Sequence, residues 1–203
     1  MNKTLTYYEN NAQILSCEYE SAKIDNLHQL LLETFTSGSY LLEIGCGSGR
    51  DASFMIKHGY KILAIDGSEK MIEEAKRLHP ELKNSLKALC VPSELNFKSL
   101  SFDGIYSIAT LMHLSHNLLD IAFNKIYNLL KPNGKFVFSV PLNRDDIDET
   151  KRDHQGRYFM ILSKSEWIQL CKEHQFEIEY IDVINDGLGR SGINWLTCIV
   201  KKR

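Results

Sequence analysis

Three glycines at alternate positions follow an apolar run in the first quarter of the chain, where residues 41–49 read LLEIGCGSG. Because glycine has no Cβ, it lets the backbone turn sharply and lets a ligand approach closely. Asp66 follows 21 residues after Gly45, at the end of the next apolar run. A carboxylate at that place can accept hydrogen bonds from ribose hydroxyls. The spacing therefore predicts a site for a ligand that contains adenosine.

The spacing of the glycines separates this loop from two better-known ones. A dinucleotide fingerprint reads G-x-G-x-x-G, but here the third glycine position of that pattern holds Arg50. A P-loop requires a glycine followed by Lys and then Ser or Thr, and that run is absent after the loop. The sequence thus favours an adenosine ligand that is neither a dinucleotide nor a nucleoside triphosphate.

A second group of reactive side chains lies in the later half of the chain. His113 is a candidate general base, and the alternative is a packing role at the start of a helix. Arg157 and Arg190 could each bind a carboxylate or a phosphate through two parallel hydrogen bonds. Tyr158 and Trp195 could supply an aromatic wall beside them.

These side chains also have structural interpretations. Arg190 could pair with Asp182 or Asp186, and Trp195 could belong to the core. His113 and His116 have a spacing that suits a metal, but the local run contains no acidic or sulfur ligand. We therefore expect no metal site.

Alternating apolar runs and amphipathic stretches predict an α/β fold with a largely parallel sheet. The expected strands are 40–44, 61–66, 86–91, 102–108, 135–140, 176–184 and 195–200. The expected helices are 9–35, 48–58, about 68–79, about 117–130 and 163–174, with Ser68 and Ser163 as N-caps. Residues 131–134, which read KPNG, predict a turn, and the last two strands are expected to be antiparallel neighbours around 186–189.

Composition sets the class of protein. The chain has 203 residues, of which 43% are hydrophobic and 25% charged, and its net charge is -2. This predicts one globular domain and disfavours nucleic-acid binding through bulk charge. Five scattered cysteines without a C-x-x-C pair, the lack of a long apolar run and the lack of a signal-like start predict a cytoplasmic protein without a membrane partner.

Four segments in order resemble class I S-adenosylmethionine-dependent methyltransferases. They read EIGCGSG at 43–49, IDGS at 65–68, FDGIYS at 102–107 and LLKPNGK at 129–135. The resemblance covers about residues 38–200. It implies a Rossmann-like, doubly wound, seven-stranded sheet that is mostly parallel, with a C-terminal antiparallel hairpin. Residues 1–37 would form an N-terminal helical cap, and the charged stretch 143–160 a solvated loop or a lid.

The resemblance also implies roles. Glu43 would orient the loop or reach the methionine amine through water, and Asp66 would hold the ribose. The other implied cofactor contacts come from the glycine loop, the adenine side and an aromatic cover: Tyr8, Gly45, Cys46, Gly47, Arg50, Gly67, Met71, Ser93, Glu94 and Ile108. The substrate side would be bordered by Arg157, Tyr158, Arg190 and Trp195.

The reaction implied is direct displacement of a methyl group, which needs alignment and exclusion of water rather than a nucleophilic residue. Residues 107–114, which read SIATLMHL, lack the Asn/Asp-Pro-Pro-Tyr/Phe run of amine-directed nucleic-acid methyltransferases. We therefore expect a small-molecule acceptor methylated on O, N or S. Two alternatives stay open: methylation of RNA, since the tail resembles that of tRNA wobble-uridine methyltransferases, and a nucleotide-binding module or oxidoreductase without this activity.

Overall fold

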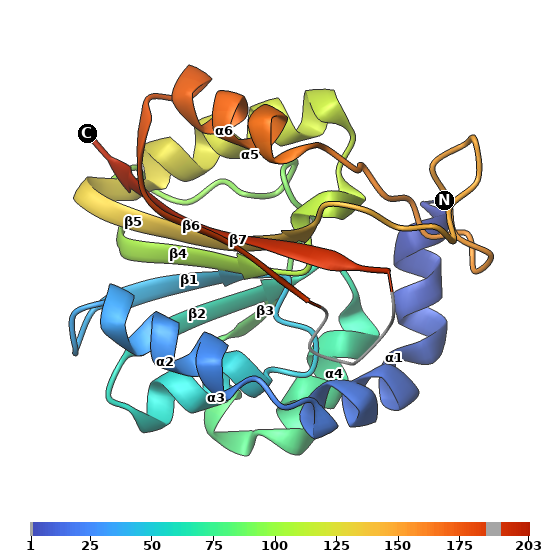
Figure 1. Ribbon diagram of the computed structural model, residues 1–203. Coiled ribbons are helices and arrows are strands. Elements are labelled where there is room, and N and C mark those ends of the chain that lie inside the picture. Colours follow the sequence, from blue (N-terminus) through green and yellow to red (C-terminus); the bar gives the residue numbers. More distant parts are fainter. Residues whose placement is uncertain (1, 186–191) are drawn as a thin grey trace.

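The computed structural model describes residues 2–185 and 192–203. Over these residues seven strands form one sheet in the order β3-β2-β1-β4-β5-β7-β6 (Figure 1). The strands are β1 Tyr40–Ile44, β2 Lys61–Asp66, β3 Leu86–Ala88, β4 Phe102–Ile108, β5 Leu130–Pro141, β6 Phe176–Asn185 and β7 Asn194–Lys202. The α-helices are α1 Lys3–Ser21, α2 Asp25–Thr34, α3 Arg50–Lys57, α4 Glu69–Leu78, α5 His116–Leu129 and α6 Lys164–Glu173.

The sheet has the topology that the sequence predicts. Strands β1 to β5 pair in parallel, whereas β7 runs antiparallel to both β5 and β6. Helices α5 and α6 cover one face of the sheet, and α2, α3 and α4 cover the other (Figure 1). The fold is therefore a doubly wound, Rossmann-like α/β fold. Its strand order reverses between β1 and β4, where such sheets open a ligand crevice at their carboxyl ends.

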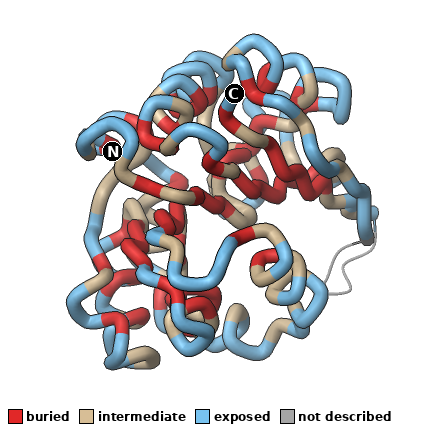
Figure 2. The backbone as a smooth tube through the Cα atoms, turned by 90° about the vertical axis from the view of Figure 1, so that its left-hand side faces the viewer, coloured by how far each residue is buried: buried red, intermediate tan, exposed pale blue. Residues whose placement is uncertain are grey.

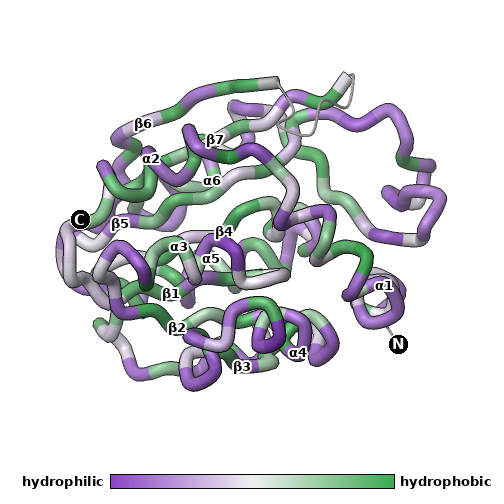
Figure 3. The backbone as a smooth tube through the Cα atoms, turned by 90° about the horizontal axis from the view of Figure 1, so that it is seen from below, coloured by the Kyte–Doolittle hydropathy of each residue, from purple (hydrophilic) through white to green (hydrophobic). Residues whose placement is uncertain are grey.

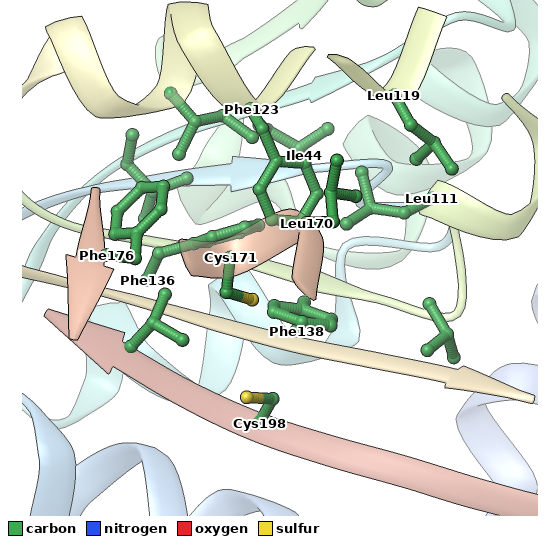
Figure 4. Packing of buried hydrophobic residues seen from close by; sticks show 14 of the residues in the cluster. Ile44, Leu111, Leu119, Phe123, Phe136, Phe138, Leu170, Cys171, Phe176 and Cys198 are labelled. Carbon is green, nitrogen blue, oxygen red and sulfur yellow. The ribbon is translucent and has the colours of Figure 1, made fainter. Parts of the chain in front are cut away.

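Two apolar clusters hold these layers together, and buried residues follow the strands and the inner helix faces (Figure 2). On the α5 side, Phe123 packs edge-on against Phe136 and Phe138 of β5, at 5.7 Å between ring centroids in both cases (Figure 4). Trp167 of α6 is fully buried in the same cluster. These rings fix the position of β5, whose carboxyl end borders the site.

Several expected boundaries need correction. The expected helix 9–35 is two helices, because Ala22 adopts an extended conformation and its N–H caps α1 at Tyr19 O. Helix α1 begins six residues earlier than expected, since the Asn2 side chain accepts the Thr4 N–H at 3.0 Å. Helix α3 begins at Arg50 rather than at residue 48, because Gly49 before it has a left-handed conformation.

Two strands also differ from expectation. Strand β3 ends at Ala88 instead of residue 91, since the Cys90 N–H leaves the sheet and bonds to the Glu94 carboxylate. Strand β5 begins at Leu130, and the expected turn at 131–134 is an irregularity inside it, where the register with β4 shifts and Asn133 has φ 64°. The N-caps at Ser68 and Ser163 are confirmed.

Helix α1 lies beside α4, near the end of the sheet where the parallel strands finish (Figures 1 and 3). It contacts α4, and its buried residues include Ala12, Leu15 and Ser16. The N-terminal segment therefore covers the end of the sheet at which the glycine loop lies.

Candidate active site

The glycine loop leaves β1 in a conformation that only glycine adopts readily. Gly45, Gly47 and Gly49 have φ values of 77°, 54° and 83°. A Cβ on Gly45 would lie 2.0 Å from Thr110 Oγ1, so no larger residue fits there. The loop thus packs directly against the Thr110 side chain in the segment after β4.

Asp66 closes the loop from the end of β2. Its Oδ2 accepts the Gly47 N–H at 3.0 Å, and its Oδ1 accepts the Ser68 N–H at 2.9 Å. A carboxylate has about four lone-pair sites, so about two remain for further donors. Burial raises the pKa of the Asp66 carboxyl. The group therefore gains from additional donors such as a pair of ribose hydroxyls.

Side chains of α1 cover this loop. The Tyr19 ring lies 3.3 Å from the position of a Cβ on Gly47, and Leu5 lies 3.4 Å from that on Gly67. Met71 Cε of α4 lies 3.6 Å from the same Cβ position on Gly47. The surroundings of these two Cβ positions are therefore apolar and aromatic.

Two polar contacts join α1 to the loop. Arg50 Nη1 donates to Tyr19 O at 2.6 Å, and Ser48 Oγ donates to a Glu20 carboxylate oxygen at 2.7 Å. The Arg50 Nε and Nη2 donate to Asp51. Arg50 was predicted to contact the cofactor, and the structure uses three of its donors within the protein.

Glu43 lies buried in β1 beneath the loop. Tyr106 donates its hydroxyl to Glu43 Oε2 at 3.1 Å. Burial, together with the nearby Asp51 carboxylate, raises the pKa of Glu43 well above its ordinary value. Asp51 in turn meets His28 of α2 at 3.0 Å. Glu43 thus supports the loop from below.

The remaining predicted cofactor residues divide into two sets. Cys46 is buried in the loop, and Ile108 is half-buried at the end of β4. Ser93 and Glu94 are exposed and hold their own turn: Ser93 Oγ donates to Cys90 O at 3.2 Å, and Glu94 accepts the Cys90 N–H at 2.6 Å. On that side of the crevice Cys90 Sγ comes within 3.7 Å of the Cβ position of Gly67.

His113 lies opposite the loop, in the short 3-10 turn Leu111–His113 after β4. Its Nδ1 donates to Tyr158 O at 2.7 Å, because a carbonyl can only accept. That bond leaves Nε2 as an acceptor, and the Tyr8 hydroxyl of α1 donates to it at 2.9 Å. Burial lowers the pKa of His113 to about 4, so the ring is neutral near pH 7.

Two arginines that precede Phe159 in the sequence lie near its ring, beside this histidine. The Arg157 guanidinium lies over Tyr7 at 4.7 Å and near Phe159 at 5.4 Å, and its Nε donates to fully buried Asp153 at 2.7 Å. The Arg144 guanidinium lies over Phe159 at 4.1 Å. Arg157 was predicted to bind substrate, and in the structure its guanidinium is hydrogen-bonded to Asp153.

The other predicted substrate residues are placed as follows. Tyr158 contributes its backbone to His113, while its ring lies 5.8 Å from the Arg152 guanidinium. Trp195 is half-buried and pairs with Pro141 at the carboxyl end of β5. Arg190, with the turn expected at 186–189, lies outside the described residues.

Sequence reasoning did not find Tyr19, Leu5, Arg144 or Phe159. The helical spacing of Leu5, Tyr8 and Tyr19 with buried Ala12 was available as a signal, but the expected helix began too late to reveal it. Arg144 carries no such signal, because the charged stretch around it has no periodicity.

Metal and membrane features complete the description. Within 2–185 and 192–203 there is no group of three or more His, Cys, Asp or Glu side chains placed to hold a metal ion. In the same part of the chain, the helices are too short or too polar to cross a bilayer.

A glycine loop closed by Asp66 at the switch point of a doubly wound sheet defines the class of protein. Comparison with known proteins specifies it: the family model described as a methyltransferase domain matches residues 17–184, and the chain belongs to this family. The family uses S-adenosylmethionine as its methyl donor.

Individual relatives agree with this assignment. The chain is 29% identical over 157 residues to the O-methyltransferase resE of Aspergillus sclerotiorum, covering 73% of this chain and 59% of the relative. It is 33% identical over 122 residues to the 18S rRNA (guanine(1575)-N(7))-methyltransferase of Saccharomyces cerevisiae, covering 55% and 44%. The chain spans about half the length of the curated relatives it matches.

A solved structure shares the fold over nearly the whole chain. It is the 1,6-didemethyltoxoflavin-N1-methyltransferase of Burkholderia thailandensis, crystallised with bound 1,6-didemethyltoxoflavin and S-adenosylhomocysteine. The TM-score is 0.81 at 17% identity, over 98% of this chain and 87% of that one. The expected fold is therefore confirmed.

Proposed function

We propose that this protein transfers the methyl group of S-adenosylmethionine to an O, N or S atom of a small-molecule acceptor. The observation that carries the proposal is the hydrogen bond from the Gly47 N–H to Asp66, in a glycine loop that leaves the Cβ position of Gly47 beside the Tyr19 ring. When bound, the donor supplies a methyl carbon activated by the positive charge of its sulfur. The protein then has to align an acceptor and exclude water.

Asp66 would accept hydrogen bonds from the ribose, and Gly45, Cys46 and Gly47 would lie against the methionine part. Gly67, Met71 and Ile108 would enclose the adenosine. Glu43 and Arg50 act from beneath the loop through Tyr106 and Asp51. Ser93 and Glu94 remain candidates for the adenine amine, reached only if their turn rearranges.

His113 is the proposed catalytic residue. Its Nδ1 donates to Tyr158 O, so its Nε2 carries a lone pair that accepts the Tyr8 hydroxyl. The O–H or N–H of an acceptor can replace that hydroxyl and donate to Nε2. The acceptor's lone pair forms the new bond to the methyl carbon, and the electrons of the broken carbon–sulfur bond stay on sulfur. The acceptor's proton leaves to Nε2 or to water.

The surroundings support an enclosed acceptor. Residues 1–37 act as a cap over the crevice, and residues 143–160 act as a lid that supplies Arg157 and Tyr158 to the acceptor side. Trp195 and Arg190 would extend that side from the β6–β7 end. The proposal places the enzyme in the cytoplasm, which fits five cysteines that are all unpaired.

The direct test is isothermal titration with S-adenosylhomocysteine and, separately, with NAD. We expect saturable binding of S-adenosylhomocysteine and none of NAD. Binding of NAD without binding of the sulfur ligand would instead support the oxidoreductase reading and overturn the proposal.

RNA methylation is a second candidate because of the yeast rRNA relative. The net charge of -2 disfavours it unless a partner provides the RNA surface. Filter binding to total tRNA and rRNA at two salt concentrations distinguishes the two acceptor classes, since phosphate-driven binding falls steeply with salt.

A further inference from the structure

Two arginine–aspartate pairs lie near the Phe159 ring, and the two aspartates differ in how far they are buried. Asp153, the partner of Arg157, is fully buried and also accepts the N–H groups of Gln155 and Arg157. Asp146, the partner of Arg144, is 43% exposed. The Arg157 pair is therefore part of the fold, whereas the Asp146 carboxylate can leave.

Arg144 itself is held in place. Its side chain is only 6% exposed, and its guanidinium is stacked on Phe159 at 4.1 Å. Its Nε and Nη2 both donate to the two oxygens of Asp146, a bidentate geometry. A buried guanidinium requires an anion, and any carboxylate or phosphate can supply the same two acceptors.

Phe159 also connects Arg144 to the proposed reaction centre. The Phe159 and His113 rings are 4.8 Å apart between centroids, and His113 Nε2 faces the Tyr8 hydroxyl. One aromatic ring therefore separates Arg144 from the atom that would orient the acceptor. An anionic group on Arg144 would lie at the far end of a small acceptor.

We propose that the acceptor carries a carboxylate or phosphate that binds Arg144, and that Asp146 occupies this position until the acceptor displaces it. This deepens the proposed function and rests on it. Asp146 thereby favours acceptors whose anionic group can compete with its own carboxylate for the Arg144 guanidinium. Neutral compounds of the same shape gain nothing at Arg144.

The test measures binding of three probes to the donor-product complex by titration calorimetry at constant ionic strength. The probes are benzoate, phenyl phosphate and the neutral isostere benzamide. For the wild-type protein we expect weak binding of an anion and none of benzamide. The anion that binds more tightly shows whether the acceptor's charged group is a carboxylate or a phosphate. The affinity of each anion is then compared among the variants.

Asp146→Asn removes the internal competitor, so anion affinity should rise about tenfold. Asp145→Asn is the matched control, because Asp145 is exposed in the same loop and the charge change is equal. It should change anion affinity less than twofold. Arg144→Gln should abolish anion binding, while Arg77→Gln on exposed α4 should not. The gain in Asp146→Asn cannot arise from misfolding.

Equal effects of Asp145→Asn and Asp146→Asn would mean that only bulk charge acts, and would overturn the inference. Persistence of anion binding in folded Arg144→Gln would do the same. Titration with S-adenosylhomocysteine alone reports separately on the proposed function. If that ligand fails to bind, the anion titrations on the free protein still test the Arg144 site by itself.

Discussion

The Tyr8 hydroxyl lies 2.9 Å from His113 Nε2, so residues 105 positions apart in the chain meet across the crevice. Tyr8 belongs to α1 and His113 to the turn after β4. The Tyr158 backbone sets the tautomer of His113, and Thr4 of α1 accepts the Tyr158 N–H at 2.8 Å. The same contacts that position the proposed base therefore also hold the helix that covers the site.

His113 should make the protein less stable in mild acid. Its pKa is about 4 when folded, because of burial, and ordinarily 6.5. Between these values the unfolded chain binds a proton that the folded protein does not. The free energy of unfolding therefore falls as pH falls, by about 2 kcal/mol between pH 7 and pH 5 from this group. Urea unfolding at both pH values should show a smaller decrease for His113→Gln than for the wild-type protein.

Exposed His154 provides the control for that comparison. His154→Gln should retain the wild-type decrease in stability between pH 7 and pH 5. A decrease of the same size in His113→Gln would mean that His113 is not the group responsible.

Asp66→Asn should weaken the binding of S-adenosylhomocysteine. The amide keeps the shape of the carboxylate but replaces one acceptor with a donor and removes the charge. We expect a loss of about 1–3 kcal/mol in binding free energy, which corresponds to an increase in Kd of about five- to 150-fold. Calorimetric titration measures it, with Glu69→Gln on the exposed first turn of α4 as the matched control. Unchanged affinity in Asp66→Asn would show that the ribose binds elsewhere.

The sequence predicts the central sheet well for a physical reason. Strands β1, β2 and β4 are short apolar runs bounded by turn residues, and their limits match those expected. The glycine loop and Asp66 were found because their spacing reflects backbone geometry. Local patterns of this kind are visible in a single sequence.

Contacts between distant segments are not visible in that way. Tyr19 reaches Gly47 only because α1 folds back along α4, and Arg144 stacks on Phe159 only because the charged loop closes. Neither contact has a periodicity of its own. The sequence likewise does not show whether the Arg157 guanidinium is available to a ligand. Only the structure shows that it donates to Asp153.

Glu43→Gln should stabilise the protein at alkaline pH. Burial raises the pKa of Glu43 well above its ordinary value, so the folded protein loses stability as pH rises and the carboxyl ionises. Glutamine can still accept the Tyr106 hydroxyl and carries no charge near Asp51. The gain in free energy of unfolding should therefore grow from pH 5 to pH 8. Glu18→Gln, at an exposed position of α1, should show no such trend, and a trend of equal size there would contradict the assignment.

Lys202→Met should destabilise the fold without affecting the site. Lys202 is buried near the end of β7, and its Nζ donates to Tyr127 O at 2.7 Å and to Leu130 O at 2.9 Å, at the C-terminus of α5. Methionine fills similar space but leaves both carbonyls without this donor, at a cost of about 1–3 kcal/mol. Chemical denaturation should show this loss, whereas Lys201→Met next to it should change stability by less than about 0.5 kcal/mol. Because the α5 terminus lies far from the glycine loop along the fold, binding of S-adenosylhomocysteine should be unchanged in both variants. A weakened ligand affinity in Lys202→Met would instead mean that the end of α5 and the crevice are coupled.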